Sequence, residues 1–138
     1  MSDKKLDKLK NLFMMQERLM KHLRSVDPVE VPEWPIDLAD RKSQRACRDF
    51  ALRATEELFE AILMLKRWKG HRVIDQAEID RQAFTEEIVD SLHYIIEVMI
   101  LTGVSEDQLY DAFVKKHEIN MQRIDRLKHE KEKSSHVC

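Results

Sequence analysis

The chain contains 138 residues, of which 43% are apolar and 36% charged, and it has only two glycines and three prolines. This composition predicts an all-α globular protein, because a disordered chain would carry fewer apolar residues and a β protein more turn residues. The formal net charge of −2 excludes a general attraction to nucleic acid or to an anionic membrane surface. We expect a single domain over residues 1–130 and a flexible tail over residues 131–138.

The cysteines and the hydropathy profile bear on the compartment. Cys47 and Cys138 do not show metal-ligand spacing, and two such thiols suit a reducing cytosol better than a disulfide framework. The first residues, MSDKKLDKLK, lack the apolar core of a signal peptide, and no window approaches the length of a membrane span. The sequence therefore predicts a cytoplasmic protein that has neither nucleic acid nor a membrane as its partner.

The first half of the chain predicts two helices joined by a proline-rich link. Apolar residues recur near helical spacing over residues 3–24, which predicts a first amphipathic helix. The link DPVEVPEWP contains all three prolines and must be extended, because proline disfavours helix at its own position and at the one before it. A second helix is expected to begin after an N-cap at Asp37 or Asp40. It would run to Lys69, where Gly70 ends it.

The second half of the chain predicts two more helices. The third is expected over residues 81–102, and Gly103 would end it. Ser105 with Gln108 three residues later has the pattern of a capping box, which predicts a fourth helix that continues to about Lys128. Four helices with short polar links predict a four-helix-bundle-like all-α fold.

Two of the predicted helices carry pairs of carboxylates inside apolar runs. Glu57 and Glu60 lie three residues apart in TEELFEAILMLKRWK, so they share one helix face. Glu87 and Asp90 repeat this spacing in TEEIVDSLHYIIEVMIL. An ionised carboxylate away from water is costly unless a cation meets it. If the two helices face each other, the four carboxylates enter one pocket, where hard oxygen ligands select Mg²⁺ or Mn²⁺.

A structural ion-pair network and a redox centre are two alternatives for these carboxylates. An ion-pair network would need an arginine, and the candidates are Arg48, Arg53 and Arg123. A ferritin-like di-metal site would need a Glu-x-x-His from each of two helices, whereas the chain offers a single near match, Asp90 with His93. The pattern therefore disfavours a redox centre and leaves the divalent-cation site and the ion-pair network as alternatives.

The predicted fourth helix carries two cations and an amide along one stripe. Lys116, Asn120 and Arg123 are spaced four and three residues apart, so they share a face. Such a set suits a polyphosphate or a nucleotide, although lysine and arginine are also common at a solvated helix end. Glu97 lies seven residues after Asp90 on the same face of the third helix, and we expect it to pair with Lys116 or Arg123.

Aromatic residues near the carboxylates are candidates for holding a nucleoside. Trp68 and Lys69 close the second predicted helix, and Trp34 lies in the proline-rich link. A tryptophan is more often a core or loop anchor than a base-stacking platform. Tyr94 lies one turn after Asp90, where it offers either a ribose contact or a buried ring with a hydroxyl partner.

Taken together, these motifs resemble a known family. The chain has an ExxE motif at 57–60, an ExxD motif at 87–90 and a Lys-x-x-x-Asn-x-x-Arg motif at 116–123. This set is similar to that of the all-α nucleoside triphosphate pyrophosphohydrolases, a superfamily that includes the MazG-like proteins, the dCTP pyrophosphatases and the dimeric dUTPases. The similarity covers roughly residues 34–125.

The resemblance implies an Mg²⁺-dependent enzyme, with Mn²⁺ as a substitute, that hydrolyses a nucleoside triphosphate between its α- and β-phosphates. It implies that the carboxylates of the ExxE and ExxD motifs hold the metal: Glu57, Glu60, Glu87 and Asp90. Glu57 or Glu60 would be the catalytic residue that orients or deprotonates a water. The matched substrate-binding residues are Trp68, Lys69, Tyr94, Lys116, Asn120 and Arg123, and the loop around Trp34 is a further candidate for binding the base.

The substrate and the state of assembly follow less directly. The chain is nearest in style to the dimeric dUTPases, so the candidate substrates are dUTP, then dCTP and the purine dNTPs, in sanitation or adjustment of the nucleotide pool. Lys116-His117 stands where dimeric dUTPases commonly have Lys-Asn, which counts against specificity for uracil. An alternative of another class is a non-catalytic helical interaction module with structural charges. Helices that are apolar on most faces predict association, and the resemblance implies a homodimer or a homotetramer.

Overall fold

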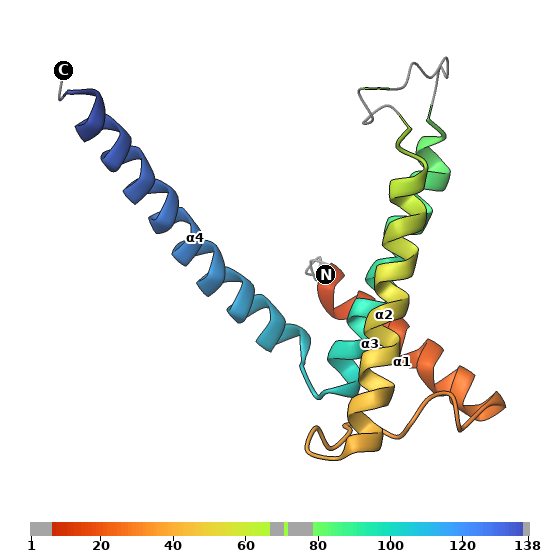
Figure 1. Cartoon of the computed structure of the whole chain (residues 1–138). Coiled ribbons are helices and arrows are strands. Elements are labelled where there is room, and N and C mark those ends of the chain that lie inside the picture. Colours follow the sequence, from red (N-terminus) through yellow and green to blue (C-terminus); the bar gives the residue numbers. More distant parts are fainter. Residues whose placement is uncertain (1–6, 67–70, 72–78, 137–138) are drawn as a thin grey trace, which may run out of the picture. The chain divides into compact units, whose positions relative to one another are not determined.

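The computed structural model describes residues 7–66, 71 and 79–136 (Figure 1). Four α-helices and no strand occur in these ranges, so the predicted all-α fold with four helices is confirmed. The chain forms two compact units, residues 1–104 and residues 105–138. Predictions that concern Trp68, Lys69, Gly70 and Cys138 fall outside the described residues.

Helix α1, Lys8–Val26, begins at Asp7, whose side chain accepts a hydrogen bond of 3.0 Å from the backbone N–H three residues on. This is the geometry of an N-cap, and it satisfies a donor that the first helical turn leaves free. The helix turns three buried side chains toward the interior, at spacings of three and four residues: Phe13, Gln16 and Met20. The predicted first amphipathic helix is therefore present.

Helix α2, Arg41–Leu63, has Asp40 as its N-cap, which is one of the two predicted positions. The helix ends earlier than expected. The N–H groups of Met64 and Leu65 donate to carbonyls three residues before them, which tightens the last turn and ends the α-helical pattern. The predicted continuation to Lys69 is therefore wrong.

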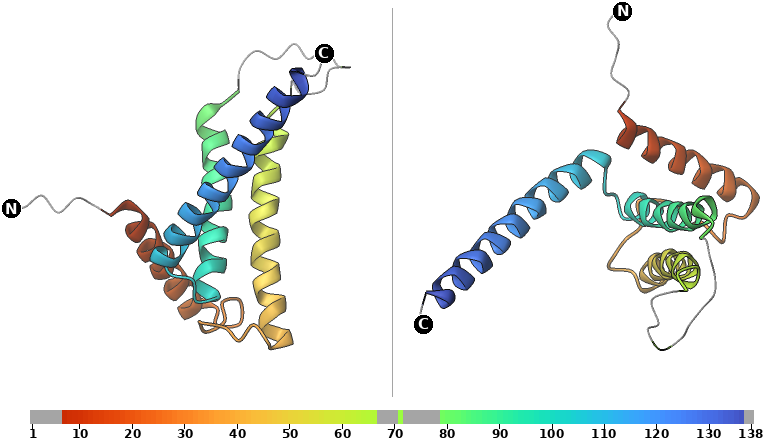
Figure 2. Two further views of the ribbon diagram at one scale, coloured as in Figure 1. Left: turned by 90° about the vertical axis from the view of Figure 1, so that its left-hand side faces the viewer. Right: turned by 90° about the horizontal axis from the view of Figure 1, so that it is seen from above.

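Helix α3, Arg81–Leu101, packs beside α2 and runs in the opposite direction (Figure 2). At its end the N–H of Val104 donates to the carbonyl of Met99 at 2.8 Å, and the N–H of Gly103 donates to that of Ile100 at 3.1 Å. These two bonds form a Schellman motif. Gly103 has a φ of +77°, a left-handed conformation that favours glycine, so the predicted helix end is confirmed.

The core of the first unit lies where α1 packs across α3, which in turn packs against α2 (Figure 2). Its buried cluster contains Met20, Val31, Phe50 and Leu101. Val31 comes from residues 27–36, here named the proline segment, which connects α1 to α2 without a helix. The N–H of Ile36 donates to the carbonyl of Leu101 at 2.8 Å, and this bond ties the proline segment to the end of α3.

Helix α4, Glu106–Ser135, makes up most of the second unit. The Ser105 hydroxyl accepts from the N–H of Gln108 at 3.2 Å, and the Gln108 side chain accepts from the N–H of Ser105 at 2.9 Å, so the predicted capping box is confirmed. The helix continues past the expected end near Lys128, because lysine and glutamate in KHEKEK are good helix formers. No described helix is by itself long and apolar enough to cross a membrane, and only α3 and α4 taken as a broken pair reach such a length and composition.

Candidate metal centre

A buried hydrogen bond holds the two carboxylate-bearing helices in register. The Ser91 hydroxyl on α3 donates to the backbone carbonyl of Ala54 on α2 at 2.7 Å. Ser91 is 4% exposed and Ala54 6%, and such small side chains let two helices approach closely. Glu57 lies about one turn from Ala54 and Glu87 about one turn from Ser91. The hydrogen bond therefore brings these two carboxylates to the same level of the helix pair.

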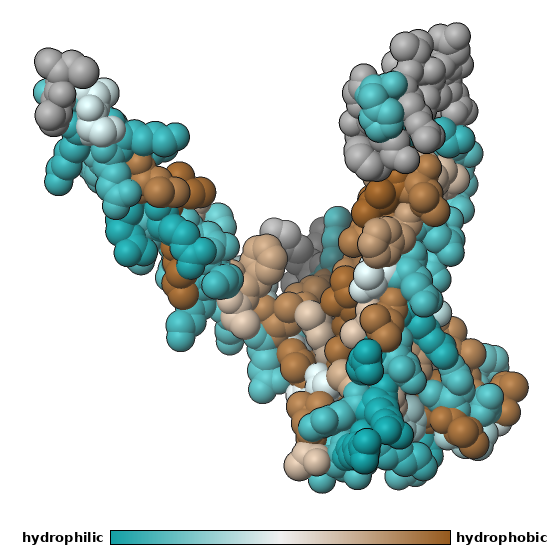
Figure 3. Space-filling model, viewed as in Figure 1, coloured by the Kyte–Doolittle hydropathy of each residue, from teal (hydrophilic) through white to brown (hydrophobic). Residues whose placement is uncertain are grey.

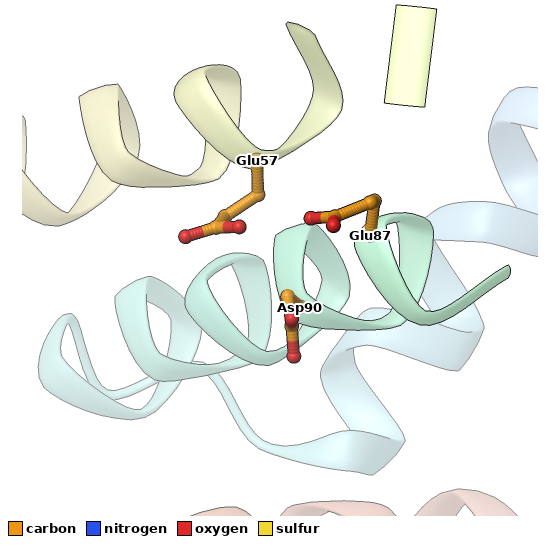
Figure 4. A group of neighbouring side chains, drawn as sticks. All are labelled: Glu57, Glu87 and Asp90. Carbon is orange, nitrogen blue, oxygen red and sulfur yellow. The ribbon is translucent and has the colours of Figure 1, made fainter. Parts of the chain in front are cut away.

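Three of the four predicted metal ligands converge. One carboxylate oxygen from each of Glu57, Glu87 and Asp90 lies within 4.8 Å of the other two. Figure 4 shows Glu57 projecting from α2 toward α3, the helix that carries Glu87 and Asp90. The ExxE and ExxD helices thus face each other, which is the condition under which the sequence expects the carboxylates to meet.

Glu60 belongs to the same acidic neighbourhood. Partial desolvation raises the pKa of Glu87, and the neighbouring carboxylates raise it further, with that of Glu60 foremost. Like charges at short range disfavour full ionisation unless a cation joins them. We name Glu57, Glu60, Glu87 and Asp90 the carboxylate cluster.

The carboxylate cluster lies at the surface rather than in the expected apolar pocket. Its members Glu60 and Asp90 are exposed, and the other two are half-buried. The apolar run around Glu60 is itself largely exposed, since Phe59 is 57% and Leu63 73% exposed, whereas Ala61 is buried. A single stripe of α2 faces the interior. A cation at this cluster would therefore be attracted by the crowding of like charges and not by burial.

The alternative, an ion-pair network, does not form around the cluster in the described structure. Arg53, one of its candidate arginines, pairs with Glu30 of the proline segment. The remaining ion pairs among the described residues join Lys21 to Glu17, Arg24 to Glu33 and His129 to Glu132. None of these pairs reaches the carboxylate cluster, so the described residues of the first unit leave its charge uncompensated.

The donor set fits a hard divalent cation. Mg²⁺ prefers oxygen ligands and usually binds through one or two carboxylates while it keeps several waters and substrate phosphates. The convergence of Glu57, Glu87 and Asp90 at the surface suits that mode of binding. His93, the near match to a ferritin-like ligand, shares a hydrogen bond of 2.6 Å with Gln16 of α1 instead. The chemistry of the cluster thus favours Mg²⁺ or Mn²⁺ over a metal that needs nitrogen ligands.

Two of the predicted nucleoside-binding rings have structural contacts. The indole N–H of Trp34 donates to Glu17 at 3.4 Å, and the ring packs against the core of the first unit. Tyr94 also packs against that core, and its ring centroid lies 6.4 Å from that of Phe50. Both rings remain partly exposed. Their predicted contacts with a nucleoside stay predictions, as do those of Trp68 and Lys69, which are outside the described residues.

The predicted phosphate-binding residues lie on α4, in the second unit. Lys116, Asn120 and Arg123 are all exposed, and their spacing places them on one face of the helix. An exposed stripe of this kind can bind an anion and is equally common on a solvated helix. Their role in substrate binding therefore stays a prediction.

Arg53 and Glu97 are two further polar residues of the first unit that lie near its core. The Arg53 guanidinium pairs with Glu30 and lies over the Phe50 ring, 5.1 Å from its centroid. Arg53 and Glu30 are 23 residues apart, so no local spacing could have indicated the pair. Glu97 is 3% exposed, and its Oε1 has no hydrogen-bond partner within the described structure. The oily run around Glu97 was the signal in the sequence for this burial.

The comparison with protein-family models finds no match for this chain. The comparisons with curated proteins and with solved structures find none either. The resemblance to the all-α pyrophosphohydrolases therefore depends on the motif residues alone and stays a prediction.

Proposed function

We propose that this protein is an Mg²⁺-dependent nucleoside triphosphate pyrophosphohydrolase, which converts a dNTP and water into a dNMP and diphosphate. The observation that carries the proposal is the convergence of Glu57, Glu87 and Asp90 from two helices, with one oxygen of each within 4.8 Å of the others. The matching ExxE, ExxD and Lys-x-x-x-Asn-x-x-Arg motifs support the same reaction.

In this proposal the carboxylate cluster holds the metal, with Mn²⁺ as a substitute for Mg²⁺. A bound Mg²⁺ supplies positive charge that neutralises the triphosphate and lowers the pKa of a bound water. The ligands are oxygens alone, which agrees with a hydrolytic rather than a redox reaction.

The chain itself contributes a base to the reaction. Glu57 or Glu60 orients a water and takes its proton as the water oxygen attacks the α-phosphorus in line. The bond from the α-phosphorus to the oxygen that bridges it to the β-phosphorus breaks, and diphosphate leaves with that oxygen. The proton then passes from the carboxylate to solvent. A carboxylate at the surface, as Glu60 is, can exchange it with water.

The same proposal assigns the substrate contacts that the resemblance implies. Lys116 and Arg123 would stabilise the charge that develops on diphosphate, and Asn120 would donate a hydrogen bond to the substrate. The remaining substrate-binding candidates are Trp34, Trp68, Lys69 and Tyr94. The favoured substrate is dUTP, with dCTP and the purine dNTPs as alternatives of the same class.

The decisive experiment is an assay against five substrates. The protein is incubated with Mg²⁺ and, separately, with dUTP, dCTP, dTTP, dATP or dGTP, and the products are separated by ion-exchange chromatography. We expect monophosphate and diphosphate from one or two of the five, and no product in EDTA. The base preference is read from the same panel.

A matched pair of variants shows whether the cluster is responsible. Glu60→Gln removes a member of the cluster and should abolish turnover, whereas Glu56→Gln removes a nearby exposed carboxylate of the same helix and should leave it unchanged. A folded protein that hydrolyses none of the five substrates would overturn the proposal. So would a Glu60→Gln variant with normal turnover.

A second candidate function, a helical interaction module without catalysis, is favoured by apolar residues on the surface of the α2–α3 pair (Figure 3). Among them Phe59 is 57%, Leu63 73% and Leu92 42% exposed, which is unusual for large apolar side chains of a monomer. Such a module would associate without any dependence on a metal. Light scattering coupled to size-exclusion chromatography, with and without Mg²⁺, measures that association, and the substrate panel then separates the two functions.

A further inference from the structure

Glu97 is a buried carboxyl that the proposed reaction does not use. Its side chain is 3% exposed, and its Oε1 has no hydrogen-bond partner in the described structure. A buried carboxylate without partners is costly, so such a group either keeps a proton or draws a cation toward itself. Glu97 lies seven residues beyond Asp90 on α3, outside the carboxylate cluster.

The cation whose charge acts on Glu97 in the described structure is Arg53 of α2, and it already has a partner. The Arg53 guanidinium forms an ion pair with Glu30 of the proline segment, while its charge also acts on Glu97. The Phe50 ring, 5.1 Å from the guanidinium carbon, holds Arg53 beside the core. Two carboxylates therefore compete for one cation, with Glu30 on the solvent side and Glu97 on the buried side.

The proline segment depends on few polar ties. Arg24 of α1 donates to the carbonyl of Val31 at 3.1 Å and pairs with Glu33 at 3.0 Å. The N–H of Ile36 donates to α3. The pair of Glu30 with Arg53 is the ion pair that ties this segment to α2 in the described structure. A change in the partner of Arg53 therefore changes how the segment is held.

We propose that Glu97 is a proton-operated positioning residue for Arg53. When Glu97 is neutral, Arg53 stays with Glu30 and the proline segment is docked on α2. When Glu97 is ionised, it draws Arg53 inward, Glu30 loses its partner, and the proline segment loosens together with Trp34. This device does not depend on the proposed enzymatic activity, although Trp34, a candidate for binding the substrate, lies in the segment that it would loosen.

The surroundings of Glu97 favour such a change near neutral pH. Burial raises the pKa of Glu97 to about 7, with Arg53 lowering it and Glu30 raising it. The other titratable groups nearby on α3 are His93 and Tyr94, and His93 is hydrogen-bonded to α1. The buried side chains that α1 contributes are neutral. Arg53 is thus the single cation, among the described groups acting on Glu97, that can respond to its ionisation.

Amide hydrogen exchange by NMR tests the proposal on the intact chain. The Ile36 N–H, bonded to the carbonyl of Leu101, reports on docking of the proline segment. After correction for the intrinsic exchange rate, we expect its protection to be about tenfold lower at pH 8 than at pH 6, because a carboxyl that titrates near 7 is then mostly ionised. Equal protection at the two pH values would overturn the proposal.

Three variants assign the effect. Glu97→Gln keeps the shape of the side chain without its charge, so its Ile36 protection should be high at both pH values. Glu30→Gln removes the tie, so its protection should be low at both. Glu33→Gln, the matched control, loses the other ion pair of the segment and should keep the response to pH. A pH response that persists in Glu97→Gln would assign it to another group, such as His93, and would overturn the proposal.

Discussion

The helix pair α2–α3 carries two groups of acidic side chains that differ in how their charge is balanced. The carboxylate cluster gathers four acids at the surface, and no described ion pair reaches it. About two turns farther along α3, Glu97 is buried, and Arg53 of α2, whose charge acts on it, pairs with Glu30 of the proline segment. Among the described residues of the first unit, one group has a cation beside it and the other has none.

The difference in burial between the two groups indicates which of them an ion from solvent can reach. Charges exposed to water are screened and remain available to an ion that enters from solvent. A buried acid is served by an internal cation or by a proton. We therefore expect changes in the carboxylate cluster to alter activity and metal binding, and changes around Glu97 to alter stability and its dependence on pH.

The largest expected effect is on catalysis. Under the proposed function, Glu87→Gln should reduce turnover roughly 10³-fold, or about 4 kcal/mol in activation free energy, because it removes a ligand from the cluster. Its melting temperature should stay the same or rise, since one of several crowded negative charges is gone. Glu86→Gln is the matched control, because Glu86 hydrogen-bonds with Gln82 outside the cluster. Turnover near that of the wild type in Glu87→Gln would contradict the expectation that the carboxylate cluster controls activity.

A smaller effect, on the free energy of unfolding, is expected from the buried Glu97. The pKa of Glu97 is raised from 4.5 in its ordinary state to about 7 in the folded protein. The folded state therefore holds this proton more tightly than the unfolded state, so the stabilisation is complete below pH 4.5 and is lost as the pH rises through 7. The difference between the two pKa values corresponds to about 3 kcal/mol.

The variant Glu97→Gln measures this loss. It should be more stable than the wild type by up to about 3 kcal/mol at pH 8, and by less than about 1 kcal/mol at pH 5. Urea unfolding at the two pH values gives both differences. A constant gap between variant and wild type would show that Glu97 does not titrate in this range.

Metal binding should stabilise the folded protein through the exposed carboxylate cluster and not through Glu97. Mg²⁺ at ten times its Kd stabilises a folded protein by about 1.4 kcal/mol. We expect that shift in the thermal unfolding of the wild type and of Glu97→Gln, and a smaller one in Asp90→Asn. Equal stabilisation of all three proteins would place the ion elsewhere.

The smallest effect is expected at an exposed ion pair. Arg24 and Glu33 lie 3.0 Å apart, with the Glu33 side chain 87% exposed. Glu33→Gln should cost less than about 0.5 kcal/mol, and the cost should fall further in high salt, because water and ions screen such a pair. A loss of stability in Glu33→Gln as large as the change expected for Glu97→Gln would mean that burial does not decide how much each carboxylate affects stability.

Features that depend on neighbouring residues were predictable from the sequence. Asp40 and Ser105 were expected as N-caps because a side-chain oxygen needs only the next helical turn, and Gly103 because a left-handed residue ends a helix locally. The spacing within each carboxylate pair placed its two members on one helix face. These expectations needed no knowledge of tertiary contacts.

Features that join distant residues were not predictable. The Arg53–Glu30 pair spans 23 residues and the Ser91–Ala54 hydrogen bond 37, and neither leaves a periodic signal. The end of α2 at Leu63 was missed because the apolar run continues past it without a glycine or a proline. The exposure of Glu60 was missed because the run around it suggested burial, whereas only one stripe of α2 meets the core.

If the carboxylate cluster binds a metal as proposed, the hydrogen bond from Ser91 to Ala54 also affects which ion it selects. It fixes how far α2 stands from α3, and so it fixes the spacing of oxygens that neither residue supplies. A bulkier residue at position 91 would push the helices apart and widen the gap between Glu57 and Glu87. Since Mg²⁺ demands short metal–oxygen distances of about 2.1 Å and Ca²⁺ accepts about 2.4 Å, Ser91→Val should shift the ion preference toward the larger cation. Ser91 would in this way influence which ion binds without contacting the ion itself.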